Sequence, residues 1–334
     1  MCTDSLEHPP ARLDAIFIPT FRQDPPIVSH LESLAASAET IWLLSSGFAT
    51  SSLAEKRRSF PNNVVVCVIP DPQMTRWFLD LSSSQNPSQF FDADYDLPLK
   101  RNFAIQAART LGFERICLLD DDITISLGQV QAAASALSAA TPVASFLVSD
   151  FPDLSTMEHV NRLTSQCEYE IMPGGNCLFL KLPEAFGLFP YIYNEDWFFI
   201  HVSALKNRIV KLGDVKQEPH RPWTNLTRVR FEEFGEVIIT GILDEPDGIN
   251  SAKVNSETYW KRVIVNRARW LEDLSRYVST LEFKKAVETA TLALSSVDSK
   301  DCTYFISALK KDQEEIPCIP NLSSLLSSFN LRTK

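Results

Sequence analysis

Hydrophobic and polar positions in the first half of the chain switch repeatedly between two periods. Short apolar runs that indicate buried strands alternate with segments whose apolar residues recur at helical spacing. The expected strands are residues 14–18, 40–44, 63–69 and 115–119, and the expected helices are residues 26–38 and 98–111. Alternating strands and helices of these lengths predict an α/β fold, in which helices cover a mainly parallel sheet.

The second half of the chain is less regular. Strands are expected at 142–148 and 208–213, a strand pair at 168–180 with a kink at Pro173-Gly174-Gly175, and a helix at 194–206 with Asn194 as its cap. From about Ser256 onward the pattern is mainly helical, and its expected inner face consists of Trp260, Val263, Ala268, Leu271 and Leu274. We therefore expect an α/β domain over 1–225 and a mainly helical C-terminal region over 226–334.

One strand runs directly into three carboxylates. Residues 115–119 are followed by Asp120, Asp121 and Asp122, which would repel one another unless a cation or a solvated cleft absorbs their charge. Because side chains alternate along a strand, Asp120 and Asp122 are expected on one face, as a pair able to hold a hard divalent cation. An acidic loop after a strand is the plainer alternative. A second such pair, Asp92 and Asp94, follows no apolar run and is interpreted as a solvated turn.

Charge and cysteine content narrow the functional classes. A formal net charge of −10 argues against a nucleic-acid partner. The seven cysteines show no C-x-x-C spacing and sit partly in apolar runs, which indicates core residues in a reducing, cytoplasmic setting. Residues 1–14 do not have the pattern of a signal peptide, and no apolar run reaches the ~20 residues that span a bilayer. Peripheral contact of the acidic helical tail with a membrane remains open, as does the oligomeric state.

Four further motifs accompany the acidic strand in a fixed order. They are Pro19-Thr20, Lys100-Arg101-Asn102, Gly174-Gly175-Asn176 and Glu195-Asp196. Together with Asp120 and Asp122 this order resembles the GT-A glycosyltransferases, most closely the family-two group that uses nucleotide-diphospho-sugars. The resemblance covers roughly residues 14–223. It implies a Rossmann-like GT-A sheet and a metal-dependent, inverting transfer of a sugar from a nucleotide-diphospho-sugar to an acceptor hydroxyl.

The resemblance also implies a role for each motif residue. Asp122, Asp120 and His220 would hold Mn²⁺ or Mg²⁺, Asp196 would be the catalytic base, and Glu195 is its alternate. The nucleotide-sugar would contact Pro19, Thr20, Arg22, Ser46, Arg101, Asp120, Asp121, Gly175 and Asn176. Arg221, Arg228 and Arg230 could help to neutralise the diphosphate. Lys100 could hold phosphate, but exposed lysines are common at a helix start, so Arg101 is the preferred candidate.

The identity of both substrates is only partly implied. The family commonly has an acidic residue after its second strand to read the base, whereas this chain has Ser45-Ser46-Gly47. UDP is therefore expected from the resemblance alone. The acceptor, whether a glycan, a lipid-linked sugar or a small molecule, cannot be read from the sequence.

Two other functions use the same residues. Asp120-Asp121-Asp122-Ile123-Thr124 fits the D-x-D-x-T signature of haloacid-dehalogenase-type phosphohydrolases, with Asp120 as nucleophile and Asp122 as acid and base. A catalytically silent GT-A-like binding module is the other alternative. At single positions, Glu195 and Asp196 could be acids that stabilise a helix N-terminus, and His220 could be a surface histidine in a proline-rich loop.

Overall fold

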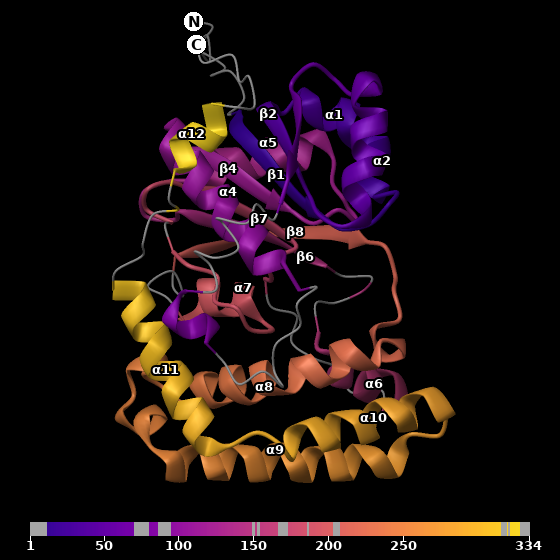
Figure 1. Ribbon diagram of the computed structural model, residues 1–334, viewed down its shortest axis with the longest axis vertical. Coiled ribbons are helices and arrows are strands. Elements are labelled where there is room, and N and C mark those ends of the chain that lie inside the picture. The colour runs from indigo at the N-terminus through magenta and orange to yellow at the C-terminus, as the bar shows by residue number, and fades with distance from the viewer. Residues whose placement is uncertain are drawn as a thin grey trace, which may run out of the picture.

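The computed structural model describes residues 12–69, 80–85, 95–148, 151, 154–165, 173–185, 187–202, 208–314, 319 and 321–327. Within these residues, helices cover both faces of a central sheet. The long helices of the C-terminal region form a separate layer beyond it (Figure 1). The predicted pair Asp92 and Asp94 lies outside the described residues, as do residues 168–172 of the strand pair expected at 168–180.

The sheet has eight strands in the order β3-β2-β1-β4-β7-β6-β8-β5. Their bounds are β1 (Leu13–Thr20), β2 (Ala38–Ser45), β3 (Val64–Val68), β4 (Arg115–Leu119), β5 (Ile123–Thr124), β6 (Val143–Val148), β7 (Cys177–Lys181) and β8 (Ile209–Gln217). The run β3-β2-β1-β4 is parallel, as is the pair β6-β8, whereas β7 is antiparallel to both of its neighbours and β5 is antiparallel to β8. The predicted α/β fold is confirmed, with its most regular part at the N-terminal end.

Helices cover the two faces of this sheet and form two of the three hydrophobic cores. One face carries η1 (Pro26–His30), α1 (Leu31–Ala35), α2 (Phe48–Lys56) and α5 (Leu127–Ala136), and the other carries α4 (Leu97–Leu111) and α12 (Leu322–Ser327). Helix α4 has a proline in its first turn and ends at Gly112, whose φ of 73° is the left-handed conformation that suits glycine. The sequence reasoning missed α5, although Ser126 and Gln129 form a capping box at its start.

The third core lies in the C-terminal region. It is built from α6 (Thr156–Ser165), α8 (Leu226–Leu243), α9 (Glu257–Tyr277), α10 (Leu281–Leu294) and α11 (Ser299–Glu314). Of the predicted inner face of α9, Trp260, Val263, Leu271 and Leu274 are buried, but Ala268 is exposed. That prediction was wrong by one position: Arg267 takes the inward place, seven residues after Trp260, because its guanidinium pairs with the buried Glu233.

The remaining short elements are η2 (Arg57–Ser59), η3 (Ser82–Ser84), α7 (Glu195–Trp197), a π turn (Phe198–Val202), η6 (Pro222–Thr224), η7 (Gly248–Asn250) and η8 (Ala252–Asn255). The helix expected from residue 194 is thus only α7 and the π turn within the described residues. Asn194 is the N-cap residue of α7, as predicted, but its side chain makes no capping hydrogen bond. Among the described helices, none combines the length and the apolar character that crossing a bilayer requires.

Candidate active site

The four parallel strands β3, β2, β1 and β4 end at one edge of the sheet, where the strand order reverses between β1 and β4. Ligands of open α/β sheets bind at such a switch point. The two strand ends are joined there, since the Thr20 hydroxyl at the end of β1 donates to Asp121 Oδ2 just beyond β4. The Asp120 carbonyl accepts from the Ile123 amide at 3.2 Å, so the chain turns immediately after Leu119.

The three aspartates of this turn pair with two different arginines. Arg22 donates to Asp121 Oδ1 at 2.6 Å and to Asp122 Oδ2 at 2.9 Å, so these two adjacent carboxylates share one guanidinium. Asp120 instead pairs with Arg101 at 3.0 Å. These contacts do not test whether Asp120 and Asp122 act as a cation-binding pair, which stays a prediction.

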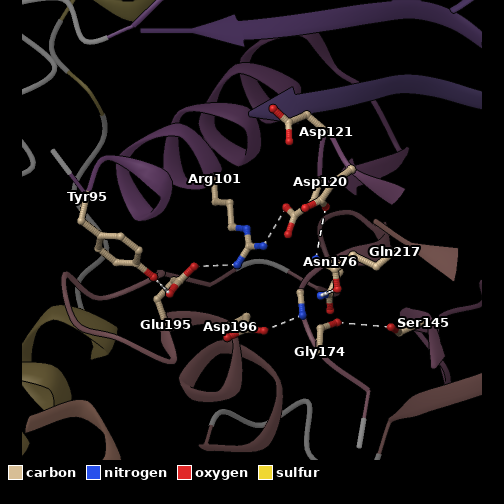
Figure 2. Close-up of polar contacts among 12 residues, drawn as sticks. Tyr95, Arg101, Asp120, Asp121, Ser145, Gly174, Asn176, Glu195, Asp196 and Gln217 are labelled. Atoms are coloured by element: carbon tan, nitrogen blue, oxygen red, sulfur yellow. Dashed lines mark hydrogen bonds and ion pairs between the residues drawn. The ribbon is translucent and has the colours of Figure 1, made fainter. Parts of the chain in front are cut away.

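Arg101 connects the acidic turn to the short helix α7. Its Nη1 lies 2.6 Å from Glu195 Oε1 while its Nη2 reaches Asp120, and the Tyr95 hydroxyl donates to the other oxygen of Glu195 (Figure 2). Burial raises the pKa of Asp120 to about 7, against the opposing effect of Arg101. The pKa of Glu195 is likewise raised to about 7, mainly by burial, with Arg101 opposing and Asp196 adding to the rise. Both carboxyls therefore take up protons near neutral pH.

Lys100 lines the site and is buried, unlike the exposed lysines that are common at a helix start. Its side chain is 1% exposed, and its ammonium donates to the Thr20 carbonyl at 2.9 Å and to Ser46 Oγ at 2.7 Å. It also pairs with Asp96 at 2.8 Å. Burial lowers the pKa of Lys100, with Asp96 opposing. Lys100 thus links the carboxyl ends of β1 and β2, a role that the sequence did not reveal because its partners Thr20 and Ser46 lie 80 and 54 residues earlier in the chain.

The Gly-Gly-Asn motif forms the floor between the acidic turn and α7. The Asp120 amide donates to the Asn176 carbonyl at 2.8 Å, and the Gly175 amide donates to Asp196 Oδ2 at 2.5 Å (Figure 2). A Cβ on Gly175 would lie 2.6 Å from the Cβ of Asp196 and 2.7 Å from Arg101 Nη1. Glycine is required here because the side chains of Arg101 and Asp196 close directly onto the turn.

A second chain of hydrogen bonds links this floor to the acidic turn. The Asn176 amide donates to Gln217 Oε1 at 3.4 Å, and Gln217 donates to Asp122 Oδ1 at 3.2 Å. The Ser145 hydroxyl donates to the Gly174 carbonyl at 3.2 Å and anchors the start of the turn. Both oxygens of Asp122 are therefore held, one by Arg22 and one by Gln217.

These residues line a cavity of about 870 Å³. All of the predicted site residues except Gly175 line it: Pro19, Thr20, Arg22, Ser46, Arg101, Asp120, Asp121, Asp122, Asn176, Glu195, Asp196 and His220. Arg228 also lines it, but Arg221 and Arg230 are exposed and do not. Sequence reasoning missed other lining residues, among them Tyr95, Phe151, His159, Gln217 and Phe231.

The cavity carries an excess of acid. Among the described residues that line it, six carboxylates face four cationic side chains. At the side away from the strand ends the lining is aromatic: the Phe151 ring stacks on His159 at 4.3 Å and lies 4.6 Å from the His220 ring. The site thus combines an acidic end with an apolar wall, as ligand pockets do when few polar groups set orientation.

The residues predicted to hold a metal are only partly brought together. No group of three or more histidine, cysteine, aspartate or glutamate side chains in the described part of the chain is arranged to hold an ion. Asp122 and His220 nevertheless line the same cavity, and His220 Nδ1 is buried without a hydrogen-bond partner. Burial lowers the pKa of His220 to about 4, with Arg228 adding to the effect and Asp122 opposing it. One or two protein ligands suit Mg²⁺, which takes its remaining ligands from phosphates and water.

No protein-family model matches the sequence, and no curated protein sequence matches it. Among solved structures, the chain is similar to glucosyl-3-phosphoglycerate synthase of M. tuberculosis, with 11% identity and a TM-score of 0.42 over 66% of this chain and 78% of that one. It is also similar to a protein from Desulfovibrio desulfuricans G20 named as a nucleotide-diphospho-sugar transferase, with 14% identity and a TM-score of 0.37 over 78% and 96%.

A third similar structure is mouse xyloside xylosyltransferase 1 in its apo form, with 11% identity and a TM-score of 0.35 over 60% and 85% of the two chains. The names of the three proteins fall in the enzyme class that the sequence resembles. Because every TM-score is below 0.5, the proposed function is built on the residues of the site instead.

Proposed function

We propose that this protein is a glycosyltransferase that moves a sugar from a nucleotide-diphospho-sugar, with UDP as the favoured nucleotide, to an acceptor hydroxyl. The observation that supports it best is the hydrogen-bonded link between the carboxyl ends of β1 and β4. There Thr20, Arg22 and the aspartate turn border a cavity that also contains an acid from a different element, Asp196. Its volume of about 870 Å³ is within the ~300–1,000 Å³ range of small-molecule sites.

The donor would bind along the strand ends. Among the cations at the strand ends, Arg22 is best placed to meet its diphosphate, because its side chain is 34% exposed whereas those of Lys100 and Arg101 are almost completely buried. Arg101 and Lys100 would act from behind, since they hold Asp120, Glu195 and Ser46 in place. Pro19, Thr20, Ser46, Asp120, Asp121, Gly175 and Asn176 complete the proposed donor site.

The acid content of the cavity calls for a further cation once a diphosphate enters. Asp122 and His220 would hold Mn²⁺ or Mg²⁺, with Asp120 beside them, and oxygens of the donor would complete the ligand set. When bound, such an ion offsets the negative charge that grows on the leaving diphosphate. Arg22 would have to release Asp122 for this, which its partial exposure permits.

Asp196 is the proposed base. Its Oδ2 is fixed by the Gly175 amide, which orients the carboxylate and leaves its second oxygen to face the acceptor. In a single displacement, Asp196 takes the acceptor proton as the acceptor oxygen bonds to the anomeric carbon. The bond from that carbon to the phosphate oxygen breaks, and the nucleoside diphosphate leaves with the electron pair. Glu195 is the weaker candidate, because Arg101 and Tyr95 already occupy its two oxygens.

Residues 1–225 would form the donor and catalytic domain in this proposal, and 226–334 the region on the acceptor side. Helix α8 supports this division, since it contributes Arg228 and Phe231 to the cavity. The phosphohydrolase alternative is weaker, because Asp120 would be its nucleophile and that carboxylate is engaged by Arg101.

The test is a panel of UDP-, GDP- and TDP-sugars, assayed for slow hydrolysis of the donor with Mn²⁺ or Mg²⁺ and compared with a generic phosphomonoester. Wild-type protein should release nucleoside diphosphate from one sugar class, and Asp122→Ala should lose at least about 100-fold of this rate. Asp273→Ala, which removes an exposed aspartate on α9, is the matched control and should keep the rate.

Binding gives a second readout that does not depend on turnover. Mn²⁺ together with UDP should raise the unfolding temperature of the wild type more than either alone, and Asp122→Ala should abolish this synergy. Equal donor hydrolysis by Asp122→Ala and wild type would refute the metal assignment. Turnover of the phosphomonoester would favour the phosphohydrolase, and metal-dependent UDP binding without any transfer would favour the silent module.

A further inference from the structure

Asn194, the residue just before Glu195 and Asp196, has an unusual backbone conformation. Its φ of 68° and ψ of 28° lie in the left-handed region, which residues with a side chain seldom adopt. Its carbonyl accepts from the Phe198 amide at 3.1 Å, so the conformation of Asn194 sets the direction in which α7 starts. Such conformations persist only where surrounding contacts hold them in place, and they cluster at functional sites.

The contact that holds Asn194 comes from helix α8. The side-chain amide of Asn194 donates to Glu236 Oε1 at 2.7 Å. On the same helix, a Cβ added to Gly235 would overlap the Tyr193 carbonyl oxygen and lie 2.9 Å from the Tyr193 Cβ. Helix α8 therefore packs against the residues directly before Glu195 and Asp196. Gly235 allows the close contact with Tyr193, and Glu236 accepts a hydrogen bond from Asn194.

Glu236 is itself fixed from a third element. Its Oε2 lies 3.4 Å from Arg267 Nη1 on α9, and Arg267 also bonds both oxygens of Glu233 at 2.9–3.0 Å. The side chain of Glu236 is 7% exposed, so it has little freedom to leave Asn194. Glu158 on α6 also acts on Glu236 electrostatically. The tether thus runs from α9 through α8 to the start of α7.

From these contacts we infer that Glu236 is a positioning residue, which aims Asp196 at the acceptor by holding Asn194 in its left-handed conformation. This inference rests on the proposed function, because it assigns a purpose to the carboxylate proposed as base. Glu236 touches neither substrate in this scheme and does not line the cavity. Loss of the tether should change the orientation of Asp196 and leave the donor site at the strand ends unchanged.

The experiment compares four variants by steady-state kinetics. Glu236→Leu removes the acceptor of the Asn194 bond, and kcat should fall about 10- to 100-fold with donor KM within about twofold of wild type. Glu236→Gln keeps an oxygen that can accept the bond and should restore kcat to within about threefold. Glu233→Gln weakens the same arginine pairing without touching Asn194, and should keep the wild-type kcat.

Asn194→Gly tests the other end of the tether, with a residue that adopts the left-handed conformation freely. It should fold normally and lower kcat by a similar factor as Glu236→Leu. The double variant should show no further loss beyond about twofold, because both changes remove one interaction. The side-chain amide resonance of Asn194 in an NMR spectrum should shift in Glu236→Leu and stay near its wild-type position in Glu233→Gln.

The outcomes separate this inference from the proposed function. Wild-type protein that transfers sugar from no nucleotide-sugar would refute the proposed function. The shift of the Asn194 side-chain amide resonance in Glu236→Leu would then test the Asn194–Glu236 contact alone. An active wild type with unchanged kcat in Glu236→Leu would overturn the positioning role. So would equal losses in Glu236→Gln and Glu236→Leu, or additive losses in the double variant.

Discussion

Replacing Arg101 by methionine is expected to be the most damaging single change at this site. Arg101 is 3% exposed and lies 2.6 Å from the buried Glu195 and 3.0 Å from Asp120, whose side chain is 22% exposed. Methionine fills a similar length but leaves the buried Glu195 and the partly exposed Asp120 without their cation. Breaking a buried ion pair by removing one partner costs about 3–5 kcal/mol. We expect Arg101→Met to lower the free energy of unfolding at pH 7.5 by this amount.

The size of the effect on the melting temperature follows from the length of the chain. At about 2.1 cal/mol/K per residue, 334 residues give an unfolding entropy of roughly 0.7 kcal/mol/K, so the melting temperature should fall by about 4–7 °C. The fall should be smaller at pH 5.5. The pKa values of Asp120 and Glu195 are already raised to about 7 by burial, and they rise further without Arg101, so both carboxyls are neutral there.

Scanning calorimetry of Arg101→Met beside Arg276→Met provides the measurement. Arg276 also bonds two carboxylates, Glu272 and Asp273, but its side chain is 62% exposed, and surface pairs of this kind are worth at most about 1 kcal/mol. If Arg101→Met loses no more stability than Arg276→Met, the ion pairs of Arg101 with Glu195 and Asp120 contribute little to the stability of the fold, and the reasoning on their charges is wrong.

Two further predictions concern the same region. Gly175→Ala places a Cβ against Asp196 and Arg101, and should destabilise the fold by about 1–3 kcal/mol, as overpacking does. It should also lower kcat more than it lowers donor affinity. An unchanged melting temperature and unchanged kinetics would contradict the close packing at Gly175. The pKa of Glu236 is raised to about 8, mainly by burial and Glu158, with Arg267 opposing. Because that folded value exceeds the unfolded value of about 4.3, its contribution to stability is complete below pH ~4.3 and lost as pH rises through about 8. The free energy of unfolding, measured from pH 5 to 9, should therefore decline less steeply with pH in Glu236→Gln than in wild type. Parallel curves would disprove the raised pKa of Glu236.

Much of the N-terminal fold was determined by the sequence itself. Apolar runs and helical spacing located β1, β2, β3, α4 and β4 to within a few residues, because a parallel sheet buried on both faces leaves a local hydrophobic pattern. The motif order also placed Thr20, Asp122 and Asp196 among the residues that line one cavity. Local patterns were weaker where burial depends on partners far away, as in α5, α6 and α8.

Only the tertiary structure decided how the charges are paired. Sequence spacing did not reveal that Arg22 pairs with Asp121 and Asp122, or that Arg101 pairs with Asp120. The burial of Lys100 and the bond from Asn194 to Glu236 were equally hidden. Residue type and spacing determine which groups can be ionised and on which face of a helix or strand they lie. The oppositely charged partner of each aspartate is 19 to 100 residues away in the chain, so only the folded structure brings the two charges together.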